Sequence, residues 1–327
     1  MDTLLFALNA ILPIVLLILL GYFLKRIRLF SREFLSVWNK VCFRVFLPAF
    51  LFYNIYSLES LRQVNWIFIA YGAGAVLMLF LIGLACSAIF VKDPAKKGVL
   101  AQAVFRSNFA IIGVPLAMSL FGEAGAASAS LLSAFTITEF NIFGVVSLSV
   151  FRGGEEKPSA KKVLLGIVKN PLIIGIVAAV CVLGIREIFI AANVSFRLSD
   201  IGFLTQTLEY VAKMATPFGL IVLGGEFEFS AVGRLWKEIT FGTVMRILFA
   251  PALFLTVAYF FIPSLSGEHF ASYIALFGTP VAVSSAIMAK EMDGDGELAG
   301  QLVVWTTVFS AFTLFAAISV FRALGVL

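Results

Sequence analysis

The chain has 327 residues, 61% of them hydrophobic, and a mean hydropathy of +1.03. Soluble domains are roughly 45–50% apolar and about 25% charged, whereas only 13% of this chain is charged. These values exclude a soluble globular protein and indicate an all-α integral membrane protein in contact with the lipid bilayer. The excess of 24 Lys and Arg over 19 Asp and Glu reflects loop topology rather than nucleic-acid binding.

Ten stretches of the chain predict membrane-spanning helices. Such a helix needs about 20 mostly apolar residues, and the apolar runs lie at roughly 4–24, 33–55, 65–91, 98–120, 125–151, 163–185, 203–225, 239–262, 270–290 and 297–321. The spans at 33–55 and 203–225 are the least regular, because each carries charged residues. The predicted fold therefore contains ten transmembrane helices.

The loops on the two sides of the predicted membrane differ in positive charge. The loops that follow odd-numbered spans, with the ends of those spans, carry Lys25, Arg26, Arg28, Arg32, Lys92, Lys96, Lys97, Arg152, Lys157, Lys161, Lys162, Arg234, Lys237 and Lys290. The opposite side carries Arg62, Arg186, Arg197 and Arg322. Because Lys and Arg accumulate in cytoplasmic loops, we predict a multi-pass protein of the cell inner membrane with both termini outside.

The most polar segment lies at the middle of the chain. It reads RGGEEKPSAKK over residues 152–162, and we interpret it as a cytoplasmic linker between residues 1–151 and residues 163–327. Each half then contains five predicted spans. Because five is an odd number, the second half enters the membrane in the opposite orientation, and the sequence predicts two inverted five-helix repeats.

A motif that occurs once in each half supports this repeat. The fourth span contains IIGVPLAMSL and the ninth contains LFGTPVAVSS, and both fit G-x-P-[LV]-A-x-S. The motif sets Gly113, Val114 and Pro115 against Gly278, Thr279 and Pro280. Two ordinary proline kinks are the simpler alternative, since proline is common in membrane helices.

Glycine and proline in the middle of a span predict an interrupted helix. Proline removes a backbone donor and clashes with the preceding turn, and glycine permits the unusual dihedral angles of an interruption. The freed backbone groups are tolerated only where they face protein or a water-filled cavity. Two matched interruptions therefore predict that broken helices 4 and 9 cross at the membrane midplane, where half-helix N-termini attract an anionic ligand.

Several of these segments resemble the auxin efflux carrier family. The similarity is carried by QAVFRSNFAIIGVPLAMSLFGEAG at 102–125, VKNPLIIGIV at 168–177, ATPFGLIVLGGEF at 215–227 and the proline-centred ninth span, and it covers essentially the whole chain. The family includes plant auxin carriers and bacterial permeases proposed for malonate and other organic acids. The resemblance implies a scaffold domain of helices 1, 2, 6 and 7, and a transport domain of helices 3–5 and 8–10 that moves like an elevator. It is compatible with a homodimer formed through the scaffold helices.

Polar residues of the fourth span are the first candidates for a substrate site, because ionisable groups inside a membrane are costly and usually functional. Arg106 would supply positive field for an anion, or else extend toward the membrane surface. Asn108 matches an Asn that lies near the anionic substrate in the plant carriers. Its amide would donate to a carboxylate, or else bond to a neighbouring helix.

Two further candidates lie in the fifth and ninth spans. Glu139 is the one acid deep within the regular spans, and it would either pair with Arg106 or Arg246 or accept a proton during transport. Ser284 follows Pro280, and its hydroxyl would line the crossing or bond back to the helix backbone.

These observations predict a secondary transporter that moves small organic anions, with carboxylates as the expected class. A membrane sensor or scaffold that binds a ligand without moving it is the alternative. The sequence has no phosphate-binding GxxxxGK[ST] motif, and its single His269 lies in a predicted loop. We therefore predict no enzyme activity, no catalytic residues, no metal site, no cofactor and no nucleic-acid partner.

Overall fold

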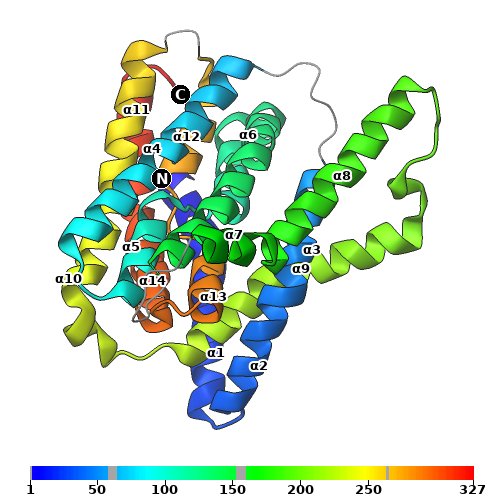
Figure 1. The fold of residues 1–327 in the computed structure, drawn as a ribbon. Helices are drawn as coiled ribbons and strands as arrows, with labels where there is room; N and C mark the ends of the chain where they lie inside the picture. The colour runs from blue at the N-terminus through cyan, green and yellow to red at the C-terminus, as the bar shows by residue number, and fades with distance from the viewer. Residues whose placement is uncertain (1, 58–64, 152–159, 263–264) are drawn as a thin grey trace.

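The computed structural model describes residues 2–57, 65–151, 160–262 and 265–327. Over these residues the chain is all-helical, as predicted, and β-type pairing is limited to one isolated bridge between Ser107 and Val281. Figure 1 shows a bundle of helices from which α8 (Pro171–Ala191) and the first part of α9 (Gly202–Glu226) extend as an arm. Residues 152–159 of the predicted linker lie outside the described residues.

The helices fall on both sides of this linker. The first half contains α1 (Asp2–Arg26), α2 (Arg32–Val41), α3 (Leu47–Tyr56), α4 (Trp66–Phe90), α5 (Pro94–Phe105) and α6 (Val114–Val150). The second half adds to α8 and α9 the helices α7 (Ala160–Val168), α10 (Ala231–Val244), α11 (Ala250–Phe261), α12 (Gly267–Gly278), α13 (Val283–Glu291) and α14 (Gly296–Ala323). A 3-10 turn, η3 (Leu198–Asp200), and three π-helical segments complete the described structure: η1 (Cys42–Phe46), η2 (Phe109–Gly113) and η4 (Met245–Phe249).

Among the described residues, six helical stretches are long and apolar enough to cross a membrane. They are Arg32–Tyr56, Trp66–Phe90, Phe109–Val150, Pro171–Ala191, Ala231–Phe261 and Gly296–Ala323. Large apolar side chains cover their outer faces, and Phe90 and Phe261 are 71% and 78% exposed, which suits lipid rather than water. The remaining predicted spans lie on α1, on α9 and on two interrupted segments around Ser107 and Val281. The total of ten spans stays a prediction.

The helix α6 contains a sharp break where two predicted spans meet. Gly122 has a φ of 58°, and Phe121 before it is also non-helical. A Cβ atom on Gly125 would lie 2.1 Å from the carbonyl oxygen of Ala117, although residues eight apart in a straight helix are about 12 Å apart. The chain therefore folds back at Phe121 and Gly122, so that α6 consists of two helices packed against each other.

Each π-helical segment stands directly before a proline. The segments η1, η2 and η4 end two residues before Pro48, Pro115 and Pro251, and in each the amide that follows the segment donates five residues back instead of four. Proline cannot donate a hydrogen bond, and its ring clashes with the carbonyl four residues earlier. A widened turn makes room for the ring, so these three prolines bend helices without breaking them.

Glycines allow the closest helix contacts in the bundle. A Cβ atom on Gly21 of α1 would lie 2.0 Å from the carbonyl oxygen of Ile221, and one on Gly224 of α9 would lie 1.9 Å from that of Ile18. The helices α1 and α9 therefore touch backbone to backbone, in the manner of small-residue interfaces in membranes. The helix α3 packs on α8 and α9, and α12 packs on α6.

We expect Gly224→Ala to destabilise the protein, because the added methyl group would overlap the α1 backbone. Overpacking of this kind costs roughly 1–3 kcal/mol, and the melting temperature of the purified protein in detergent should fall by several degrees. Gly184→Ala on α8 is the control, since a Cβ atom there meets nothing within 4 Å. Equal melting temperatures for the two variants would contradict this packing.

Candidate functional site

Two interrupted segments meet inside the bundle. The amide of Asn108 donates to the carbonyl oxygen of Pro280 at 2.7 Å, and the amide of Ala282 donates to that of Arg106 at 3.3 Å. Ser107 and Val281 form the antiparallel bridge between these two bonds. The first segment joins α5 to η2 and α6, and the second joins α12 to α13. The structure therefore brings together two chain breaks that lie far apart in the sequence.

The two breaks stand differently relative to the shared G-x-P motif. In the second half the motif lies at the break itself, since α12 ends at Gly278 and α13 begins at Val283. In the first half the break comes earlier, because α5 ends at Phe105 and the chain is helical again from Phe109. Pro115 therefore belongs to the helix after the break, where η2 accommodates its ring. The interruption in the first half depends on Arg106, Ser107 and Asn108 rather than on the motif.

The guanidinium of Arg246, on η4, lies at the ends of the two helices that lead into the crossing. Its N–H groups donate to the carbonyl oxygens of Thr279 at 3.1 Å, Val104 at 3.1 Å, Phe105 at 3.2 Å, Leu276 at 2.9 Å and Phe277 at 2.6 Å. The last carbonyls of a helix have no partner within it, and together they carry about half a negative charge. The side chain of Arg246 thus provides hydrogen-bond donors for the last carbonyls of both α5 and α12. The partial negative charges of the two helix ends together balance the positive charge of the guanidinium.

The beginnings of the other two half-helices face a cavity of about 50 Å³. Phe109, Ala110 and Ile111 line it from the start of η2, and Val283 and Ser284 line it from the start of α13. The first amides of a helix have no acceptor within it and favour negative charge. The crossing is therefore polarised, with two helix ends at Arg246 and two helix beginnings at the cavity.

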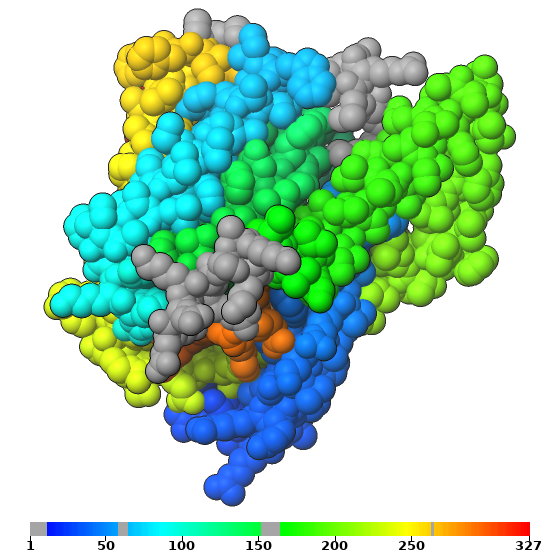
Figure 2. Space-filling model, in the orientation of Figure 1, coloured from blue at the N-terminus to red at the C-terminus, as the bar shows by residue number. Residues whose placement is uncertain are grey.

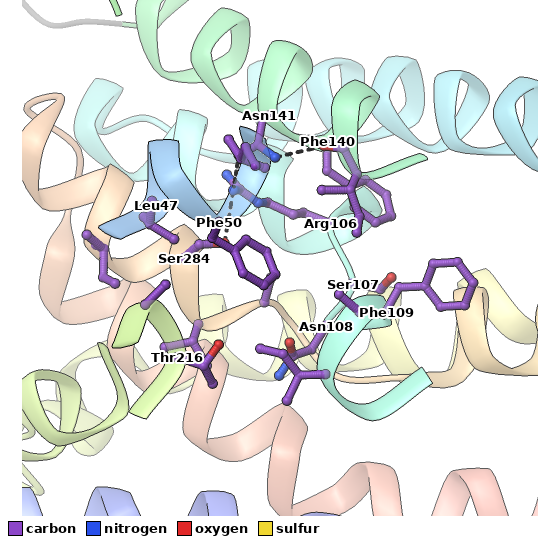
Figure 3. A pocket seen from close by; sticks show the side chains of 18 residues that line it. Leu47, Phe50, Arg106, Ser107, Asn108, Phe109, Phe140, Asn141, Thr216 and Ser284 are labelled. Carbon is purple, nitrogen blue, oxygen red and sulfur yellow. Dashed lines mark hydrogen bonds between the residues drawn. The ribbon is translucent and has the colours of Figure 1, made fainter. Parts of the chain in front are cut away.

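Arg106 is 2% exposed and also lines this cavity. Its Nη1 donates to Gln102 Oε1 at 3.0 Å and lies 3.1 Å from Met288 Sδ, and its Nη2 donates to Asn141 Oδ1 at 2.7 Å and to Ser284 Oγ at 2.9 Å. Figure 3 shows the last two of these contacts beside Phe50. A Cβ atom on Gly144 would lie 2.8 Å from Arg106 Nη1, so this glycine makes room for the guanidinium. All four partners are uncharged.

Two buried hydrogen-bond donors at the cavity have no partner. Asn108 is 4% exposed and Ser107 is 3% exposed, and both line the cavity. Within the described part of the protein, the Asn108 Nδ2 and the Ser107 Oγ make no hydrogen bond. An unsatisfied buried polar group costs about 1–3 kcal/mol, and such groups in native structures call for an explanation. A ligand with acceptor oxygens would satisfy both.

The rest of the cavity wall is mostly apolar and comes from distant parts of the chain. Leu47, Phe50 and Leu51 contribute from α3, and Ala215 and Thr216 contribute from α9. A cavity of about 50 Å³ holds only a few water molecules, since one water needs roughly 10–15 Å³ by this measure. The arrangement suits a small ligand that has one negatively charged group and is otherwise apolar.

The predicted site residues divide into three groups. Arg106, Asn108 and Ser284 lie together on the cavity wall. The motif residues lie around the crossing without lining the cavity: Gly113, Val114, Pro115, Gly278, Thr279 and Pro280. Glu139 stands apart from the cavity, and its Oε2 is buried without a hydrogen-bond partner among the described residues.

The predicted pairing of Glu139 with Arg106 or Arg246 is wrong. Arg106 bonds to neutral side chains, and Arg246 bonds to backbone carbonyls. Ser107 and Thr216 were not among the predicted site residues, and Arg246 was expected only as a possible partner for Glu139. The one available signal for Ser107 was its position directly before Asn108 in the sequence.

Comparison with known proteins identifies the family. Residues 6–318 match the family described as "Membrane transport protein", and the chain belongs to this auxin efflux carrier-type family of membrane transporters. It is 22% identical to an uncharacterized transporter of Methanothermobacter thermautotrophicus over 94% of this chain and 95% of the relative. It is 25% identical to the uncharacterized transporter YfdV of Escherichia coli, covering 88% and 89% of the two chains. A protein of Rhizobium meliloti named "Putative malonate transporter" is 23% identical over 96% and 95%.

We expect replacement of Arg246 to destabilise the fold, because five helix-end carbonyls would lose their donors. Arg246→Met should lower the unfolding free energy by at least about 3 kcal/mol, the scale for breaking a buried charged network. Arg246→Lys keeps the charge but has only three donors, so its melting temperature in detergent should be intermediate.

The control for this experiment is Arg234→Met, because the Arg234 side chain is 67% exposed and pairs with Glu297 at the surface. Its melting temperature should match that of the unaltered protein. If Arg246→Met melted no lower than Arg234→Met, the capping role would be refuted.

Proposed function

We propose that the protein is a secondary carrier of small organic anions and that the anion binds in the crossing cavity. The observation that carries this proposal is the buried guanidinium of Arg106, which has no carboxylate partner among the described residues. A buried charge without a counter-charge costs several kcal/mol. A bound carboxylate would supply the missing negative charge.

The two buried donors without partners and the beginnings of the half-helices also support a small organic anion as the ligand. The Asn108 amide and the Ser107 hydroxyl would donate to carboxylate oxygens, and the first amides of η2 and α13 would add their positive ends. The malonate named for the Rhizobium meliloti relative belongs to this class. The small cavity favours short anions over bulky ones.

The membrane arrangement that we propose has ten spans in two inverted sets of five. It rests on the charge difference between the loops, which supports a location in the inner membrane with both termini outside. The inversion is supported by the odd number of predicted spans in each half. In this arrangement the two breaks lie near the bilayer midplane, where a wet cavity tolerates irregular backbone.

The proposed transport movement follows from the two groups of helices that form the cavity. One wall belongs to α3 and α9, and the other belongs to the break after α5, to η2, to α6 and to α13. We assign the first group to a scaffold and the second to a transport domain that slides along it. At one end of α13, Asn39 Nδ2 donates to Glu291 Oε1 at 2.9 Å, and Lys290 pairs with Glu226. These contacts join the two groups and must separate for the slide to occur.

We expect Arg106→Gln to lower the uptake efficiency, kcat/KM, for small carboxylates by about 10- to 100-fold, the range for a lost charged contact of 1.5–3 kcal/mol. Asn108→Ala should lower it by about fivefold, because it removes one neutral hydrogen bond. Uptake is measured with labelled malonate and short monocarboxylates in proteoliposomes of the purified protein.

The control is Lys213→Gln, because the Lys213 side chain is 69% exposed and does not line the cavity. Arg106→Gln with normal uptake and a normal melting temperature would refute the site. Counterflow of labelled carboxylate separates a carrier from a sensor, since a sensor binds the anion but shows no counterflow.

We expect a covalent link between the two groups of helices to stop uptake. In protein with Cys42, Cys86 and Cys181 replaced by Ala, cysteines at Glu226 and Lys290 should cross-link with Hg²⁺, and uptake should cease until a thiol is added. A cysteine pair at Glu209 and Lys213, which are partners within α9, is the control and should leave uptake intact. Full uptake by the cross-linked Glu226–Lys290 pair would contradict the sliding movement.

A further inference from the structure

A second cavity, of about 660 Å³, lies at the surface between the α4–α5 turn and α10. On the left of Figure 2 the cyan surface of α4 and α5 lies against the yellow-green surface of α10. This cavity is far larger than the one at the crossing and shares no lining residue with it. It is therefore a separate cavity from the one at the crossing.

One part of this cavity is apolar and faces outward. Phe90, the last residue of α4, is 71% exposed, and its ring centroid lies 6.4 Å from that of Phe241 on α10. Leu100 of α5 also lines the cavity. Because α4 has 25 residues and therefore spans about 37 Å, Phe90 lies at the edge of the hydrocarbon layer. In a bilayer these rings would face acyl chains rather than water.

The other part of the cavity is basic. Lys92, Lys96 and Lys237 line it, and Lys96 pairs with Glu238 at 2.7 Å. The remaining acid, Asp93, accepts the Ala95 amide at 3.0 Å as a cap of α5. Neither Lys92 nor Lys237 has an ion-pair partner among the residues that the structure describes.

Position and charge together restrict the ligand. The Lys237 ammonium lies 5.7 Å from the ring centre of Trp236, which is 56% exposed, and tryptophan marks the interface between headgroups and acyl chains. Two lysines without ion-pair partners at this depth favour a phosphate. A free phosphate ion would leave the apolar wall unused, and a zwitterionic lipid would bring no net negative charge.

We propose that this cavity binds an anionic phospholipid. The headgroup phosphate lies between Lys92 and Lys237, and an acyl chain lies along Phe90 and Phe241. The site is independent of the carried anion, because no residue of the crossing takes part in it.

The test measures lipid binding to the purified full chain by native mass spectrometry, with dioleoylphosphatidylglycerol as the probe. Lys92→Gln/Lys237→Gln should weaken the apparent affinity by about 20- to 30-fold, since a basic residue at the membrane surface contributes about fivefold. Phe90→Ala should weaken it as well, by severalfold, because it removes the apolar wall. The control double variant is Lys40→Gln/Lys169→Gln, which removes two exposed lysines outside the cavity and should bind as the unaltered protein does.

Two further probes identify the source of the phosphate. Dioleoylphosphatidylcholine should bind much more weakly than the anionic lipid, and inorganic phosphate should not compete at millimolar concentration. Equal binding by both double variants would overturn the site. Competition by inorganic phosphate would overturn the lipid assignment, and equal binding of the two lipids would overturn the role of charge.

Discussion

Two broken helices can meet inside a membrane only if the backbone groups that the breaks release find partners, because lipid offers none. In this chain Arg246 meets that requirement for the carbonyl groups. Its guanidinium donates hydrogen bonds to five carbonyl oxygens at the ends of α5 and α12. Two further contacts satisfy backbone groups at the breaks themselves. One is the bridge between Ser107 and Val281, and the other is the Thr306 hydroxyl, which accepts a hydrogen bond from the Val281 amide at 3.0 Å. The amides at the beginnings of η2 and α13 are left for the cavity, and this separation of carbonyl ends from amide ends is the basis of the proposed anion site.

The second arginine of the crossing acts in the opposite way. Arg106 is held by an amide, a thioether, a second amide and a hydroxyl, which fix its position without neutralising its charge. Gly144 leaves the space in which it lies. A cation that is already oriented and already removed from water loses little more on binding an anion, so its attraction is realised in full. The different partners of the two arginines give them different roles: Arg246 closes helix ends, and Arg106 keeps a charge that the proposed anion would meet.

The class of fold followed from composition, because a chain that is 61% hydrophobic must bury its helices in lipid. Proline and glycine pointed to the two segments that meet, and Arg106, Asn108 and Ser284 were found because polar residues stand out within apolar spans. The exact place of the first break was not predictable, since a π-turn before Pro115 keeps that helix intact. Arg246 was expected only as one possible partner for Glu139, because the backbone carbonyls that it binds leave no mark in a sequence. Thr216 and Phe50 reach the cavity only through the packing of α9 and α3, which local patterns do not reveal.

The charge of the cavity has a consequence for movement across a membrane. If the helices around Arg106 slide against α3 and α9 as proposed, they carry an uncompensated positive charge when the cavity is empty. A bound monocarboxylate cancels this charge, and moving a neutral site through a low-dielectric region costs less than moving a charged one. The loaded transport domain would therefore move more readily than the empty one. The same buried guanidinium that we propose as the anion site would then also favour exchange of one anion for another over the return of an empty carrier.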